Sequence, residues 1–165
     1  GRGNTASGTR SCALGYGSSA SRYGQESYAA GVYSADGDLQ RVRFSMLGRT
    51  TDATPTNLTL DFSSARLVLT AGRVWILSVT VSGHRSDGAQ HAIYTRRVAI
   101  KRVGNVTTLI QSQVIGTDYE DNAACDVSIT ADDVNEALQI QVTGIAGETW
   151  RWEANIIGSE LTFGA

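Results

Sequence analysis

Apolar and polar residues alternate along most of the chain beyond residue 38. Within Leu39–Leu47, for example, Val42, Phe44 and Met46 fall on one face of an extended strand, and polar or charged residues fall on the other. A period of two is typical of a β-strand with one buried face. Eight later segments also read as strands: Asn57–Asp61, Ala65–Thr70, Arg73–Ser82, His91–Arg102, Val106–Ile115, Ala123–Thr130, Ala137–Thr143 and Thr149–Phe163.

Turn residues separate these segments, as at Ser86-Asp87-Gly88. Short strands at this spacing favour two packed antiparallel sheets. A single short helix could begin near residue 130, because Thr130 or Asp132 could cap it. We therefore predict an all-β fold whose main part is an antiparallel, jelly-roll-like β-sandwich head over residues 38–165.

Residues 1–37 differ from the rest, because they are rich in Gly, Ser, Ala and Tyr and poor in Val, Ile and Leu. The pattern G-x-x-S-x-A-x-G occurs at Gly8–Gly15 and again at Gly24–Gly31. Small-residue runs precede each copy, so the unit is 14 residues, stretched to 16 by an insertion at Arg22-Tyr23. Such a repeat predicts the coils of a short β-solenoid or β-roll, which we call the neck.

The side chains of the neck are too small to form a core within one chain. Ordering its backbone costs about 1–2 kcal/mol per residue. The neck must therefore stack on something, most simply on identical copies of itself. The competing interpretation is a flexible Gly/Ser linker.

Composition narrows the classes of protein. A chain of 165 residues can bury a core without metals or disulfides. Its net charge of −2 argues against a nucleic-acid partner. No stretch approaches the roughly 18 apolar residues of a membrane-spanning helix, and no signal peptide is visible. We expect no cofactor and no metal.

The two cysteines, Cys12 and Cys125, lie far apart in the sequence. A disulfide framework needs more cysteines, and a zinc site needs local ligand spacing. We expect two small thiols, buried or half-buried, as in a protein assembled in a reducing cytoplasm.

Charge is unevenly distributed along the chain. Residues 41–102 carry ten Lys or Arg and three acidic residues, a net charge of +7, whereas residues 103–165 carry one Arg and ten acidic residues, a net charge of −9. Consecutive hairpins of opposite sign would attract each other, within one subunit or across a subunit boundary. The alternative is two solvated faces that never meet.

The neck pattern resembles the head repeats of trimeric autotransporter adhesins and the Gly/Ser/Ala-rich collars of bacteriophage tail fibres. An ordered set of further motifs resembles the C-terminal domains of phage tail fibres and tailspikes: Tyr28–Gln40, Thr50–Asp61, Leu67–Gly72, Trp75, Gly83–Asp87 and Gly144–Trp152. The resemblance implies a homotrimer at the distal end of a virion fibre, with a trimeric neck. It also implies attachment of the phage to host surface polysaccharide or lipopolysaccharide.

Signals of catalysis are thin. His84 and Asp87 share one turn without a nucleophile elbow, and Lys101 lies among arginines. Paired carboxylates for glycoside cleavage are available in residues 118–121, but no sequence rule fixes their separation. We therefore expect that the protein is not an enzyme.

Two polar loops are the candidate glycan-binding sites, because polar and aromatic side chains together suit a sugar. The candidate residues are His84, Arg85, Asp87, Asp118, Tyr119, Glu120 and Asp121. Tyr119 is expected to be an exposed aromatic residue. Trp75, Trp150 and Trp152 lie among alternating apolar residues and are expected in the core.

The function that these observations favour is a receptor-binding tip. Three weak sites on one rigid head would gain avidity. The alternatives are a trimerisation or folding domain without receptor contact, a glycan-cleaving tailspike module, and a bacterial trimeric adhesin.

Overall fold

The computed structural model describes residues 1–163, which form fourteen strands and no helix. The strands are β1 Thr5–Ala6, β2 Cys12–Gly15, β3 Ser19–Ala20, β4 Glu26–Ala29, β5 Leu39–Thr50, β6 Thr56–Asn57, β7 Leu67–Val68, β8 Arg73–Arg85, β9 His91–Val103, β10 Val106–Val114, β11 Tyr119–Glu120, β12 Asp126–Asp132, β13 Ala137–Thr143 and β14 Trp150–Thr162. The predicted all-β class is thus confirmed. Within the described part of the chain, no helix exists that could cross a membrane. Residues 164 and 165 of the predicted head lie outside the described residues.

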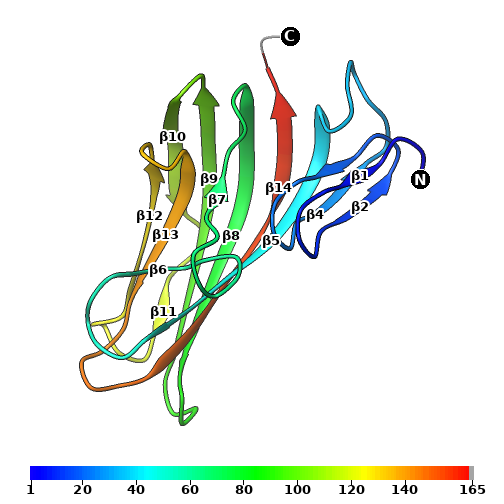
Figure 1. Cartoon of the computed structure of the whole chain (residues 1–165). Coiled ribbons are helices and arrows are strands. Elements are labelled where there is room, and N and C mark those ends of the chain that lie inside the picture. Colours follow the sequence, from blue (N-terminus) through cyan, green and yellow to red (C-terminus); the bar gives the residue numbers. More distant parts are fainter. Residues whose placement is uncertain (164–165) are drawn as a thin grey trace.

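Two sheets form the sandwich (Figure 1). The main sheet has eight strands, in the order β10-β9-β8-β14-β5-β4-β2, with β11 attached to β9. The smaller sheet has four strands, in the order β12-β13-β6, with β7 attached to β13. The long strands β8, β14 and β5 pair antiparallel over nearly their whole length.

The core lies between these sheets, and the alternating residues predicted the face of each strand that fills it. Val42, Phe44 and Met46 on β5 are all buried. The tryptophans expected in the core are buried as well: Trp75, Trp150 and Trp152. The rings of Trp150 and Trp152 stack with centroids 5.5 Å apart. The burial of such large apolar side chains is the main source of stability of the head.

The neck forms two parallel coils with a constant register of 14 residues. β1 pairs with β3 at Thr5↔Ser19, and β2 pairs with β4 at Cys12↔Glu26. The offset of 16 residues between the two motif copies is therefore not the register of the strands. The Arg22-Tyr23 segment lies in the turn before β4 and does not shift the coil.

The neck also continues into the head, because β4 pairs antiparallel with β5. Polar groups fill its interior: Ser18, Gln25 and Ser27 are buried, and Gln25 Nε2 donates a hydrogen bond to Ser27 Oγ at 2.8 Å. A second support is the packing of Tyr23 against the hydrophobic core of the head. Part of what the neck stacks on is therefore its own chain, in contrast to the expectation that it needs copies of itself.

Three local predictions are wrong. The expected strands Asn57–Asp61 and Ala65–Thr70 shrink to Thr56–Asn57 and Leu67–Val68, because the intervening residues turn around Asp61. No helix begins at Thr130, since β12 continues to Asp132 and a turn leads directly into β13.

Candidate functional site

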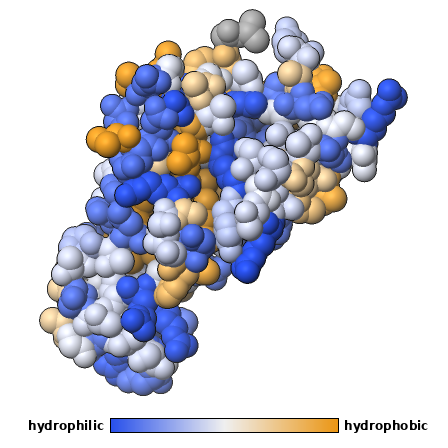
Figure 2. Space-filling model, viewed as in Figure 1, coloured by the Kyte–Doolittle hydropathy of each residue, from blue (hydrophilic) through white to orange (hydrophobic). Residues whose placement is uncertain are grey.

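Three polar segments gather at one end of the sandwich, which we call the tip and define as residues 84–91, 118–121 and 144–149. They are the β8–β9 hairpin, the acidic segment containing β11, and the loop from β13 to β14. In Figure 1 this end lies away from the neck and from the end of β14. Figure 2 shows that mainly hydrophilic and intermediate residues cover it.

The first candidate loop begins later than predicted. β8 extends to Arg85, so His84 and Arg85 are strand residues, and Asp87 belongs to the hairpin turn. Arg85 Nε donates to Asp87 Oδ1 at 2.8 Å, and Arg85 Nη1 donates to Glu148 Oε1 at 3.1 Å. Glu148 also accepts a hydrogen bond from Trp150 Nε1 at 3.0 Å. This chain of contacts braces the hairpin against the β13–β14 loop.

The acidic segment is held along β9 rather than free in solvent. Asp118 forms a bidentate pair with Arg96, at 2.6 and 2.8 Å. Tyr94 Oη donates to Glu120 Oε2 at 2.7 Å. These contacts order β11 as a short strand beside β9. The expected solvated acidic loop is therefore a structured edge.

The two candidate segments meet at His91. Its backbone N–H donates to Asp121 Oδ2 at 2.7 Å, and the Asp121 N–H donates to the His91 carbonyl at 3.0 Å. His91 is paired across the hairpin with His84. The structure therefore brings the two segments, chosen separately from the sequence, to one end of the fold.

Hydrogen bonds set the charge state of the tip. The Arg85 guanidinium holds the pKa of Asp87 below its ordinary value. The Tyr119 hydroxyl and the His91 N–H do the same for the pKa of Asp121. Burial, with the Glu120 carboxylate, raises the pKa of Tyr94. Asp87 and Asp121 are thus stable anions and hydrogen-bond acceptors, and are poor proton donors near neutral pH.

Two features of the tip remain open to a ligand. The Tyr119 side chain is 53% exposed, as predicted, while its hydroxyl is fixed to Asp121 Oδ1 at 2.6 Å. His84 lines a pocket of about 240 Å³ on the outer face of the main sheet. The pocket is lined by Leu47, Ser82, His84, Arg151, Trp152 and Glu153. Among residues 1–163, no group of three or more His, Cys, Asp or Glu is arranged to hold a metal ion.

Sequence reasoning missed the partners that hold the acidic segment, Tyr94 and Arg96. A signal was present, because Arg96 occupies an inward position in the alternating pattern of β9. A buried guanidinium requires a carboxylate partner. The acidic run at residues 118–121 was the nearest source along the chain.

No family model matches the chain, and no curated protein matches it. Three solved structures are similar, all of phage tailspikes. They are the tailspike gp49 of Acinetobacter baumannii bacteriophage Fri1 (8% identity, TM-score 0.45), that of Acinetobacter phage vB_ApiP_P1 (13%, 0.42) and that of Acinetobacter baumannii phage AM24 (8%, 0.41). They match 86%, 82% and 91% of this chain, which spans only 22%, 24% and 32% of theirs.

One of these findings corrects an expectation from the sequence. The Fri1 tailspike is described as a capsular polysaccharide depolymerase. The prediction that the protein is not an enzyme is contradicted by this finding and is wrong.

Proposed function

We propose that this chain is a polysaccharide-binding domain of a phage tail fibre or tailspike, and that its tip contacts polysaccharide or lipopolysaccharide on the host surface. The observation that carries the proposal is the convergence of two polar segments at the end of the head away from the neck, joined by the hydrogen bonds between His91 and Asp121. In the virion, the tip would face outward at the distal end of the fibre.

The chemistry of the tip suits a sugar. The exposed Tyr119 ring offers a flat apolar face for the C–H groups of a pyranose. The pocket beside it contributes an imidazole, a guanidinium and a carboxylate, from His84, Arg151 and Glu153. Groups held in position by internal hydrogen bonds lose little conformational entropy when they bind.

We also propose that the chain works as a homotrimer. Support comes from large apolar side chains that the single chain leaves exposed on the outer side of the main sheet, at Leu14, Tyr28 and Ile157. Among the described residues, β2 has a neighbouring strand in its sheet on one side only. Three copies side by side would present three tips, so that weak single-site binding becomes strong attachment.

The same surface favours a second candidate function, in which the chain only holds the fibre trimer together. The two functions make different demands on the tip. If the chain only trimerises, Tyr119→Ala and His84→Ala leave every property of the purified oligomer unchanged. If the tip binds polysaccharide, these variants form the same oligomer and bind less.

The experiment is an array of immobilised bacterial capsular polysaccharides and lipopolysaccharides, probed with the purified chain. We expect binding to a small subset of the array, weakened by Tyr119→Ala. Sedimentation equilibrium on the same samples measures the oligomer, for which we expect three chains. Absence of binding across a broad array would contradict the proposed function, and release of new reducing ends from a bound polysaccharide would reveal cleavage.

A further inference from the structure

A second polar surface lies on the flank of the sandwich, around residues 59–66, which we call the flank loop. Two pockets adjoin this loop, with volumes of about 310 and 250 Å³. Both are lined by Asn57, Thr59 and Ser63, so the two pockets share a common wall. The first also contains Arg66 and Asp132, and the second also contains Phe62.

The flank loop has a fixed conformation. Asp61 Oδ1 accepts hydrogen bonds from the backbone N–H groups of Ser63, Ser64 and Ala65, each at 2.9 Å. Thr59 joins β5 through a bridge to Leu47. The loop is therefore anchored at both ends of its turn.

Phe62 is the unusual residue of this loop. Its φ is 61°, in the left-handed region that costs a non-glycine residue about 1–2 kcal/mol. Its side chain is 59% exposed, so burial returns little of that cost. A strained backbone that holds an aromatic ring at the rim of a pocket is a feature of binding sites.

Asn57 supplies the second, independent observation. Its Oδ1 atom is buried and has no hydrogen-bond partner among the described residues. A buried acceptor without a partner costs about 1–3 kcal/mol. The atom lines both pockets, where a hydroxyl group of a ligand would satisfy it.

The remaining lining determines the class of ligand. The hydroxyl groups of Thr59, Ser63 and Ser64 line the first pocket, and the Arg66 guanidinium lies 2.9 Å from Asp132 Oδ2, so that its charge is balanced. Hydroxyls, one amide, a neutralised ion pair and one aromatic ring match a polyhydroxylated ring. They do not match a strongly charged ligand such as a phosphate.

We propose that the two flank pockets bind adjacent saccharide units of a polysaccharide, with the ring of one unit against Phe62 and a hydroxyl of the other donating to Asn57 Oδ1. The proposal rests on the proposed binding of polysaccharide by this chain but assigns a surface separate from the tip. A polysaccharide has many repeating units, so one strand can occupy the tip of one subunit and the flank of the same or another subunit.

The test is a titration of the full-length, ¹⁵N-labelled protein with N-acetylglucosamine and with glucuronate, followed by ¹H–¹⁵N NMR. We expect millimolar binding of at least one sugar, with shifts at the backbone amides of Asn57, Ser63 and Ser64. Shifts at residues 84–91 report the tip separately, so a failure of the tip and a failure of the flank give different spectra. Shifts confined to the tip, or absent with both sugars, overturn the proposal.

Two variants test the roles of the residues. Phe62→Gly removes the ring and relieves the strained φ, so it raises the melting temperature while weakening flank binding at least fivefold. Asn57→Ala removes the unpaired acceptor and gives the same combination of unreduced stability and weakened binding. Tyr33→Ala is the matched control, because it removes another exposed aromatic ring far along the chain. Unchanged flank binding in both variants overturns the proposal.

Discussion

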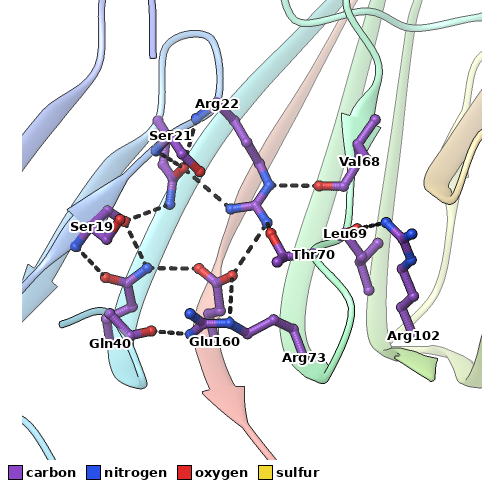
Figure 3. A network of polar contacts seen from close by, with 12 residues as sticks. Ser19, Ser21, Arg22, Gln40, Val68, Leu69, Thr70, Arg73, Arg102 and Glu160 are labelled. Atoms are coloured by element: carbon purple, nitrogen blue, oxygen red, sulfur yellow. Dashed lines mark hydrogen bonds and ion pairs between the residues drawn. The ribbon is translucent and has the colours of Figure 1, made fainter. Parts of the chain in front are cut away.

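Arg22, in the neck, and Glu160, on the last strand β14, form a buried ion pair 3.3 Å long. Their side chains are 10% and 2% exposed. Gln40 Nε2 donates to Glu160 Oε2 at 2.7 Å, Arg73 lies 4.0 Å away, and the Arg22 guanidinium lies over the Trp75 ring (Figure 3). Burial lowers the pKa of Arg22, which Glu160 partly offsets. This network attaches the neck to the head.

Replacing Arg22 is expected to cost much more stability than replacing an exposed arginine. Arg22→Met leaves Glu160 buried with weaker compensation, and breaking a buried pair from one side costs about 3 kcal/mol. Arg43 is the matched control, since it pairs with Glu26 at 3.8 Å with both side chains more than half exposed. Arg43→Met should cost less than about 1 kcal/mol. Urea denaturation of the two variants measures the difference, and equal losses would contradict a structural role for the network.

Acid is expected to destabilise the fold through carboxylates bound to backbone N–H groups. The Ala65 N–H, with those of Ser63 and Ser64, lowers the pKa of Asp61 below its ordinary 3.8. A lowered pKa in the folded state adds stability above the ordinary value, and this stability disappears as the pH falls through the lowered one. Unfolding free energy should therefore decline from about pH 5 downward.

Asp61→Asn keeps the acceptor oxygen but removes the titration. We expect this variant to be less stable than the wild type at neutral pH and to show a shallower decline in acid. Melting curves at a series of pH values measure both slopes. Identical slopes for the variant and the wild type would exclude Asp61 from the acid response.

The charge pattern of the sequence predicted real contacts. Five ion pairs within residues 1–163 join the basic segment 41–102 to the acidic segment 103–165: Arg66–Asp132, Arg73–Glu160, Arg85–Glu148, Arg96–Asp118 and Arg102–Glu136. Opposite charges thus meet within one subunit, which is one of the two arrangements that the pattern left open. The interpretation of two separate solvated faces does not hold for these residues.

Other features lay beyond the sequence pattern, because they depend on contacts between distant segments. The flank loop interrupts two expected strands, since Asp61 satisfies three backbone N–H groups that a sheet would otherwise bind. The burial of Arg22 depends on Glu160, which is distant in the chain. Alternation predicts which face of a strand is buried, but not which partner a buried charge will find.

The two thiols should react very differently. Cys12 is exposed and Cys125 is buried, and burial raises the pKa of Cys125 to about 11. Only the thiolate reacts with iodoacetamide, so Cys125 should stay unmodified in the native protein at pH 8. Intact mass should show one adduct on the native chain and two after unfolding. The control Cys12→Ser should show none until it unfolds, and rapid native labelling of Cys125 would contradict the packing.

Gly158 should be required for the close packing of β14 against β8. A Cβ atom there would lie 2.1 Å from the backbone oxygen of Ile76. Gly158→Ala must therefore push two central strands apart, at a cost of about 2–3 kcal/mol. Gly31→Ala is the control, because a Cβ there meets nothing within 4 Å. Equal melting temperatures for the two variants would be inconsistent with the register of β14.

The affinity of the protein for a polysaccharide selected from the array tests the central claim most directly. Biolayer interferometry should compare wild type, Tyr119→Ala at the tip and Tyr33→Ala in the neck, all at the same oligomeric state. Loss of one stacked ring is worth about 1 kcal/mol or more, so the account predicts a roughly tenfold weaker affinity for Tyr119→Ala and no change for Tyr33→Ala. Equal affinities for all three proteins would contradict binding at the tip.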